Sequence, residues 1–241
     1  MALEKVNILA IGVHPDDVEL SCSGTLIKNV QAGKKVGLLD LTHGELGTRG
    51  TGELRLVEAE NARKVIGASF RVNLGLKDGF FENNEAAQTK IIEVIRACQP
   101  DIVLCNALRD RHPDHGRSAE MGKVACFLSG LRRIETTWEG VPQKEWRPKQ
   151  VMHYIQDYFA EPNIVIDITR HWDQKMESIL AYSSQFYNPE SKDPESPISS
   201  QAFLEVLRGR AQNFGRYVNV DFGEGFLVER PVGVDDLNDV F

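Results

Sequence analysis

The sequence has no long apolar run, no paired cysteine motif and no excess of basic residues. Its four cysteines lack the CxxC spacing of zinc ribbons and redox sites, so we expect reduced, structural thiols in a reducing compartment. No stretch approaches the ~20 apolar residues of a membrane span. The net charge is −7, whereas nucleic acids and anionic membranes need a basic face, so neither partner is expected. The cysteines are Cys22, Cys98, Cys105 and Cys126.

The first residues also lack a secretory signal, because residues 1–17 contain one lysine and a short apolar run that ends in a polar motif. We therefore expect a cytoplasmic protein whose chain opens with a core strand. Neither GxxxxGK[ST] nor GxGxxG occurs, which argues against nucleotide binding by either loop. The 241 residues suit one α/β domain over 1–241, with an acidic, flexible tail over 231–241.

Strand and helix patterns alternate through the first half of the chain. Continuous apolar runs predict buried strands over 6–13, 36–41 and 101–105, and a weaker run predicts one over 69–74. Helices are expected between them, over 18–32, over 53–66, before Pro100 and after the loop that begins at Asn106. This βαβ spacing predicts a doubly wound, mostly parallel sheet of the Rossmann-like type.

The second half is expected to form an appended α/β portion. Strands are expected over 151–158, 163–168 and 224–228, and helices over 169–182, capped by Thr169, and over 200–217. The polar, proline-rich stretch 188–197 predicts a surface loop. We expect Tyr154, Tyr158 and Phe159 to pack in the sheet, and His153 and His171 to be structural.

Ionisable side chains crowd two short loops, at the carboxyl ends of the first and fourth expected strands. In a parallel sheet these ends face a common crevice, where ligands bind. Alone, either motif is typical of an ordinary turn, with aspartates capping a helix; two proline-linked His and Asp motifs at equivalent positions favour a shared site. The first loop carries His14, Asp16 and Asp17, and the second His112, Asp114 and His115.

Two imidazoles and one carboxylate suit a catalytic zinc, which keeps three protein ligands and one open position for water. A structural zinc would close its shell with cysteine, and neither loop contains one. The remaining aspartate and histidine can then serve as general base and as electrostatic catalyst or acid. Iron(II), cobalt and manganese accept the same ligands.

Three segments resemble the signature regions of the LmbE-like (PIG-L) zinc N-deacetylases: AIGVHPDDVELSCSGTL, LTHGELGTRGTGELR and RDRHPDHGRSAEM. The similarity extends over nearly the whole chain, including SSQF at 183–186 and GEGF at 223–226. GELGTRGT points to the branch that acts on N-acetylglucosaminyl malate in bacillithiol biosynthesis. Residues 21–23 (SCS) depart from the glycine-richer segment of many relatives, which implies altered packing near the metal loop.

By position, the resemblance implies that His14, Asp17 and His115 hold one Zn²⁺ per chain. It makes Asp16 the general base and His112 the histidine that stabilises the oxyanion, with Asp114 orienting an imidazole. Arg55 and Gln185 resemble substrate-contacting residues, and the alternative for Arg55 is a helix-surface arginine paired with Glu58 or Glu60.

The resemblance implies hydrolysis of the acetamide of a small anionic amino sugar, giving acetate and a free amine, and a homo-oligomeric protein. Three alternatives remain: a deacetylase of another N-acetylglucosamine conjugate, a metal-dependent phosphoesterase, and a non-catalytic metal- or sugar-binding module. A phosphoesterase usually needs two metals and more carboxylates, and a binding module has no use for Asp16. Arg49 and Arg111 could contact substrate, but surface arginines are the favoured interpretation. His43 is expected to be either a solvated or a pocket-lining histidine.

Overall fold

A computed structural model of the protein describes residues 3–240, and a seven-stranded sheet runs through it in the order β3-β2-β1-β4-β7-β9-β8. The first five strands in that order are parallel, β9 is antiparallel to β7, and β8 is antiparallel to β9. The doubly wound, mostly parallel sheet expected from the sequence is confirmed. The strands are β1 (Ile8–Gly12), β2 (Val36–Thr42), β3 (Phe70–Leu76), β4 (Ile102–Cys105), β7 (Gln150–Tyr154), β8 (Ile164–Asp167) and β9 (Gly223–Leu227).

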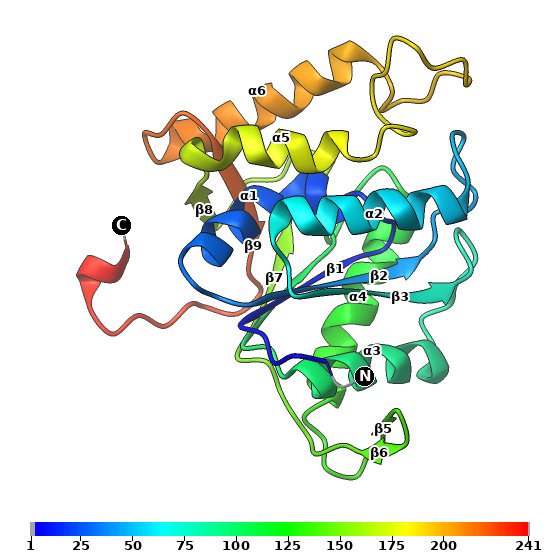
Figure 1. Ribbon diagram of the computed structural model, residues 1–241. Coiled ribbons are helices and arrows are strands. Elements are labelled where there is room, and N and C mark those ends of the chain that lie inside the picture. Colours follow the sequence, from blue (N-terminus) through cyan, green and yellow to red (C-terminus); the bar gives the residue numbers. More distant parts are fainter. Residues whose placement is uncertain (1–2, 241) are drawn as a thin grey trace.

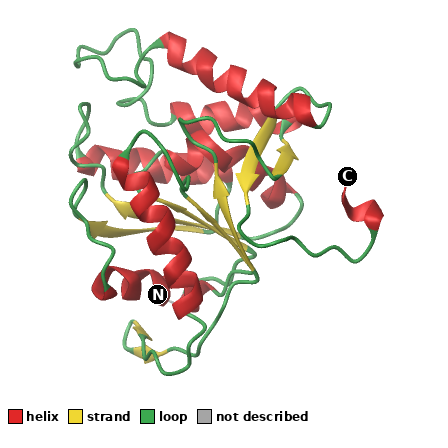
Figure 2. Cartoon of the chain, turned by 180° about the vertical axis from the view of Figure 1, so that it is seen from behind, coloured by secondary structure: helices red, strands yellow, loops and turns green. Residues whose placement is uncertain are grey.

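Helices cover both faces of this sheet (Figure 1). One face carries α1 (Asp17–Gln31), α2 (Gly52–Ile66) and α5 (Trp172–Leu180), and the other carries α3 (Glu85–Cys98) and α4 (Pro113–Leu128). The last long helix, α6 (Gln201–Tyr217), lies outside α5 and contacts β9. Figure 2, the view from behind, shows the strands between the two helical layers and the C-terminal segment leading away from them.

Successive strand residues divide the core between the two layers. Leu9 and Ile11 of β1 pack in one cluster with residues of α3 and α4, whereas Ile8 and Ala10 pack in another with residues of α1. Because both faces are covered, the central strands are continuous apolar runs in the sequence rather than alternating ones. Burial on both faces is why these strands can be recognised in the sequence.

The order of the strands reverses between β1 and β4, which lie side by side at the centre of the sheet. The chain leaves β1 toward α1 on one face and β4 toward α4 on the opposite face. The loops after these two strands therefore diverge, and a crevice opens between them at the carboxyl edge. Both histidine–aspartate motifs stand at this switch point.

Several expectations for the second half are wrong in detail. β7 ends at Tyr154, and the following Tyr158 and Phe159 are exposed in a loop instead of packing in the sheet. Thr169 does not cap α5, since its hydroxyl accepts a hydrogen bond from the Phe222 amide and a 3₁₀ turn, η1 (Thr169–His171), precedes the helix.

The structure also contains a short hairpin that was not expected, formed by the two-residue strands β5 (Thr137–Trp138) and β6 (Val141–Pro142). A second 3₁₀ turn, η2 (Leu237–Val240), ends the described chain. Within residues 3–240, every helix is too short or too polar to cross a membrane.

Candidate metal and catalytic site

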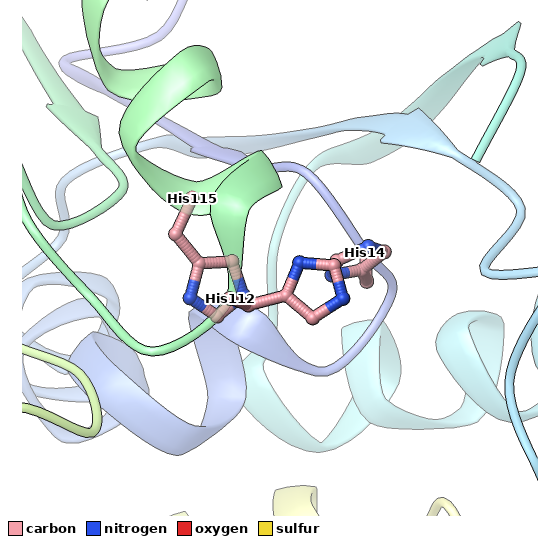
Figure 3. Close-up of side chains that lie close together, drawn as sticks. All are labelled: His14, His112 and His115. Carbon is pink, nitrogen blue, oxygen red and sulfur yellow. The ribbon is translucent and has the colours of Figure 1, made fainter. Parts of the chain in front are cut away.

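The two motifs hold their side chains at the amino ends of two helices. His14 lies in the turn between β1 and α1, and α1 begins at Asp17. His112 is the N-cap of α4, where its Nδ1 accepts a hydrogen bond from the Asp114 amide at 3.3 Å and Pro113 opens the helix. Proline suits that first helical position because the amide it lacks would have no partner there. Figure 3 shows the three imidazoles brought together from these loops.

Asp16 has an unusual backbone conformation, with φ of 121°. A non-glycine residue in that region is strained by roughly 1–3 kcal/mol, and such strain is concentrated at functional sites. The conformation lets consecutive aspartates face different partners. Asp16 Oδ2 lies 3.5 Å from Arg55 Nη2, whereas Asp17 Oδ1 lies 3.1 Å from His115 Nε2.

His14 and His115 each use one ring nitrogen to contact a carboxylate away from Asp17. His14 Nε2 lies 3.0 Å from Asp78 Oδ1 and 3.6 Å from Asp114 Oδ2. His115 Nδ1 lies 2.5 Å from Asp110 Oδ2. A metal-binding histidine typically donates its second nitrogen to a carboxylate in this way, which fixes the tautomer and the ring orientation.

The opposite ring nitrogens of these two histidines face Asp17, since His14 Nδ1 lies 3.7 Å from Asp17 Oδ2 and His115 Nε2 lies 3.1 Å from Asp17 Oδ1. In a tetrahedral zinc site with bonds of 2.0–2.2 Å, neighbouring ligand atoms are roughly 3.3 Å apart. The separation from His115 is close to that value, whereas the separation from His14 is wider and involves the other oxygen of Asp17. The chemistry of the expected donor set, two imidazoles and one carboxylate, suits such an ion.

His112 offers another donor at the same place. Ligand atoms of His14, His112 and His115 all lie within 4.8 Å of one another, and so do those of His14, Asp78 and Asp114. The His112 Nδ1 is occupied by the helix amide, which leaves Nε2 free to face the cavity. Asp17 belongs to neither group, but it adjoins His14 through Oδ2 and His115 through Oδ1. The structure thus gathers the three histidines, with Asp17 beside two of them.

The surrounding carboxylates favour positive charge at two of these imidazoles. Burial by itself lowers the pKa of His14, but hydrogen bonds with Asp114 and Asp78 raise it to about 10. Burial likewise lowers the pKa of His115, but Asp17 and Asp110 raise it to about 9. A divalent cation on neutral imidazoles would satisfy the same carboxylates, because metal binding replaces protons.

The two adjacent aspartates have opposed acidities. Burial raises the pKa of Asp16, and although Arg55 opposes the shift, the pKa is about 7. Burial raises the pKa of Asp17 too, but the charge and hydrogen bond of His115, with His14, bring it below its usual range. When two neighbouring carboxyls have such different pKa values, one can accept and release a proton while the other stays ionised. Here Asp16 is suited to the first role and Asp17 to the second.

His112 differs from the other two histidines, because burial and then the charges of His14 and His115 lower its pKa. The ring is therefore neutral at pH 7 in the metal-free protein, with its proton on Nε2 because Nδ1 accepts the Asp114 amide. A neutral Nε2–H can still donate a hydrogen bond to an oxyanion.

Arg55 and Gln185 lie together on one side of the cavity. Arg55 is buried, and its Nη2 donates to Gln185 Oε1. The alternative of a surface arginine paired with Glu58 or Glu60 is wrong, because Glu58 accepts hydrogen bonds from Ser183 and Ser184, and Glu60 pairs with Arg63.

The expectation of two surface arginines holds for Arg111 only. Arg111 is exposed and pairs with Asp157 at 2.6 Å, but it also lines the cavity over the site, so a contact with substrate stays open. Arg49 is buried, and its guanidinium donates to the Phe186 carbonyl while its own carbonyl accepts from Gln185 Nε2. His43 is half-buried and does not line the cavity.

A cavity of about 240 Å³ opens over the site. Its wall includes both predicted motifs, Arg55, and apolar contacts from α1 and from the loop before α6. The lining residues are His14, Asp16, Asp17, Leu20, Leu46, Gly47, Arg55, Asp78, Gly79, Arg111, His112, His115 and Ile198.

Four residues of the site were not predicted from the sequence: Asp78, Asp110, Asn106 and Gln156. Asp78 follows β3, Asn106 and Asp110 follow β4, and Gln156 follows β7. The signal was available, because polar residues that come just after parallel strands meet at the same edge of the sheet. Asp110 lies in the RDRHPDH segment, whereas Asp78, Asn106 and Gln156 belong to no histidine motif. For those three, the position in the sheet was the only indication.

Comparison with known proteins places the chain among deacetylases. Residues 9–126 match the family model described as PIG-L, GlcNAc-PI de-N-acetylase. The uncharacterised deacetylase YaiS of Escherichia coli is 32% identical over 131 residues, which are 52% of this chain and 70% of that protein. Diacetylchitobiose deacetylase of Thermococcus kodakarensis is 27% identical over 190 residues, covering 74% of this chain and 70% of that protein.

Among solved structures, the conserved protein TT1542 from Thermus thermophilus superposes with a TM-score of 0.84 at 30% identity, over 96% of this chain and 98% of that one. The match extends through the second half, beyond the residues that the family model covers. The chain belongs to the PIG-L (LmbE-like) family of metal-dependent deacetylases.

Proposed function

We propose that this chain removes the acetyl group from an N-acetylglucosamine conjugate, with one zinc ion held by His14, Asp17 and His115. The observation that carries the proposal is the convergence of these three donors next to Asp16, a carboxyl whose pKa is about 7. When bound, the ion polarises the amide carbonyl and lowers the pKa of water. Every other contribution comes from side chains of this protein.

Asp16 is the proton carrier. With a pKa near neutrality it can take a proton from the attacking water and then return it to the leaving nitrogen. His112 Nε2–H donates to the oxygen of the acetamide as negative charge develops there. Asp78, Asp110 and Asp114 orient the histidines. Water is consumed, and acetate and the free amine are released.

The substrate class is inferred from relatives and from the cavity. The relative from Thermococcus is named for an acetylated amino sugar, and a cavity of about 240 Å³ lies over the site. The GELGTRGT segment supports the malate conjugate of N-acetylglucosamine. Arg55, buried at the wall, offers the positive charge that an anionic conjugate needs.

The test is to incubate purified protein with N-acetylglucosaminyl malate, N-acetylglucosamine, diacetylchitobiose and p-nitrophenyl phosphate, and to measure acetate, free amine and phosphate. Deacetylation that chelation removes and zinc restores is the expected result, with the malate conjugate turned over best. Phosphate release without acetate, or acetate release that chelation leaves unchanged, would contradict the proposal.

A further inference from the structure

Two neutral amide side chains hold Asp17 in place. Asp17 Oδ2 accepts the backbone amides of Val13 and His14, at 3.0 and 2.9 Å, and Asn106 Nδ2 at 3.0 Å. Asp17 Oδ1 accepts Gln156 Nε2, also at 3.0 Å. Four donors, all uncharged, therefore fix the carboxylate that faces His14 and His115.

The two amides cannot flip, because their outer contacts fix which atom faces Asp17. The backbone N–H of Ala107 only donates, and it meets Gln156 Oε1 at 3.1 Å, so Nε2 must be the atom next to Asp17. Asn106 Nδ2 also donates to Gln156 Oε1, at 3.0 Å, and Asn106 Oδ1 accepts from the Ser118 hydroxyl at 2.8 Å. The two side chains form one connected unit.

That unit is anchored on both sides. The backbone carbonyl of Asn106 accepts from His153 Nδ1 at 2.8 Å, and the carbonyl of Gln156 accepts from Arg210 Nη1. Arg210, on α6, also donates to the Leu20 carbonyl at 3.1 Å. The unit thus joins the carboxyl ends of β4 and β7 to the last long helix.

Uncharged hydrogen-bond donors suit a metal-binding carboxylate better than lysine or arginine, because they leave its negative charge uncompensated. An ionised carboxylate can accept about four hydrogen bonds. Asp17 Oδ2 accepts three, from two backbone amides and Asn106, whereas Oδ1 accepts only one, from Gln156. The position left on Oδ1 is on the side of His115 Nε2. No arginine or lysine pairs with Asp17 among the described residues, so its negative charge stays available to a cation.

We propose that Asn106 and Gln156 are positioning residues that present Asp17 to the metal through one oxygen and so set the metal affinity of the site. The inference rests on the proposed role of Asp17 as a metal ligand. Loss of a partner that orients a ligand typically weakens metal binding about 10- to 100-fold. Gln156→Met and Asn106→Ala should each raise the dissociation constant for Zn²⁺ by that factor.

The measurement is competition between the purified, metal-free protein and a chromophoric zinc chelator, with the Tm of the metal-free protein recorded in parallel. The kcat at saturating zinc is measured as well, so that a loss of zinc affinity is distinguished from a loss of turnover. Gln174→Met is the matched control. Gln174 Nε2 donates to the Val65 carbonyl at 2.7 Å and makes no contact with Asp17. It should bind zinc as wild type does.

The Asn106→Ala, Gln156→Met double variant should bind zinc hardly more weakly than either single variant. The two side chains act together, because Asn106 Nδ2 donates to both Asp17 and Gln156. Zinc affinity equal to wild type in both single variants would overturn the inference, as would a fall in kcat at saturating zinc with no change in affinity. If Asn106→Ala does not fold, Gln156→Met decides alone. A wild-type protein that binds no zinc would overturn the proposed function as well, and that outcome is distinct from both others.

Discussion

Asp16 and Asp17 are adjacent in sequence, yet the structure separates their surroundings. Asp16 is opposite Arg55 with a pKa of about 7, whereas Asp17 contacts His115 with a pKa below its usual range. Asp16→Asn should therefore keep zinc and lower kcat about 10²- to 10⁴-fold, the contribution of a general base.

Asp17→Ala is the matched variant and should lose the metal instead. Metal content by elemental analysis and kcat by acetate release separate the two roles. Wild-type kcat in Asp16→Asn, or full metal loading in Asp17→Ala, would show that the roles are assigned wrongly.

We expect Arg55 to determine which conjugate is preferred. Its guanidinium is buried beside Asp16 and Gln185, and a bidentate grip on a carboxylate is a contact that lysine cannot reproduce. A hydrogen bond to a charged group is worth roughly 1.5–3 kcal/mol. Arg55→Ala should therefore reduce kcat/KM for N-acetylglucosaminyl malate about 10- to 100-fold and change N-acetylglucosamine little. An equal loss on both substrates would mean that Arg55 holds the sugar or Asp16 rather than the malate.

The raised pKa values of His14 and His115, about 10 and about 9, predict how the stability of the metal-free protein depends on pH. Both exceed the ordinary histidine pKa of ~6.5, so their contribution is complete below that value and is lost as pH rises through 9 and 10. The Tm of the metal-free protein should fall across this window.

Zinc-loaded protein is the control, because its imidazoles are already neutral. The stabilisation by zinc should therefore be larger at pH 9 than at pH 6.5. Burial raises the pKa of the Cys98 and Cys105 thiols to about 12, so these do not titrate in the same window. A Tm difference between loaded and metal-free protein that does not change with pH would contradict the charge assignment.

At the scale of elements, a buried ion pair attaches α5 to β9 and α1. Lys175 Nζ lies 2.7 Å from Glu224 Oε1, and both side chains are buried. Glu224 also accepts the amides of Gly24 and Thr25 in α1. Lys175→Met leaves this carboxylate buried without a counter-charge, which should cost about 3–5 kcal/mol of unfolding free energy.

Lys123→Met is the exposed counterpart, since Lys123 pairs with Glu229 at 3.0 Å on the surface. That change should cost at most about 1 kcal/mol. Denaturant unfolding of both variants compares them. Similar losses would show that the buried pair contributes no more than a surface one.

The elements of the first half were predictable because strands that are buried on both faces of a sheet appear in the sequence as apolar runs. β1 and β4 are apolar without interruption, and β2 is apolar apart from Asp40 and Thr42. The helices between them begin and end within a few residues of the expected positions. In the second half, tertiary contacts decide the boundaries. Thr169 bonds to Phe222 rather than capping a helix, and no local pattern marks that contact.

The site likewise contains residues that the sequence predicts and residues that only the fold reveals. The HPDD and HPDH motifs identified the crevice between β1 and β4, because they combine residue types that bind metals with positions after strands. Asp78 and Gln156 reach the same place from β3 and β7, where single polar residues resemble any loop residue. Arg49 looked like a surface arginine, since only the fold shows that residues 186 and 191 cover it.

At the scale of the whole molecule, one sheet joins both halves of the chain. β7, β9 and β8 extend the sheet from β4, and Arg210 and Lys175 connect the second half to α1. If 1–241 is a single domain, as the sequence predicts, the halves should unfold together in one transition. A homo-oligomer, also predicted, would make that transition depend on protein concentration.

The sequence supplies a separate probe for each half. All three tryptophans lie after residue 130, at Trp138, Trp146 and Trp172, and all four cysteines lie before it and are buried. Trp138 and Trp146 pack against the core of the first half, whereas Trp172 stacks on Phe222 in the second. The fluorescence of a Trp138→Phe, Trp146→Phe double variant therefore reports the second half, and the reactivity of the thiols reports the first. Because the halves share a sheet and a buried ion pair, the two denaturant midpoints of metal-free protein should coincide. Two separate midpoints would mean that the second half folds on its own, and the boundary would then lie between β4 and β7.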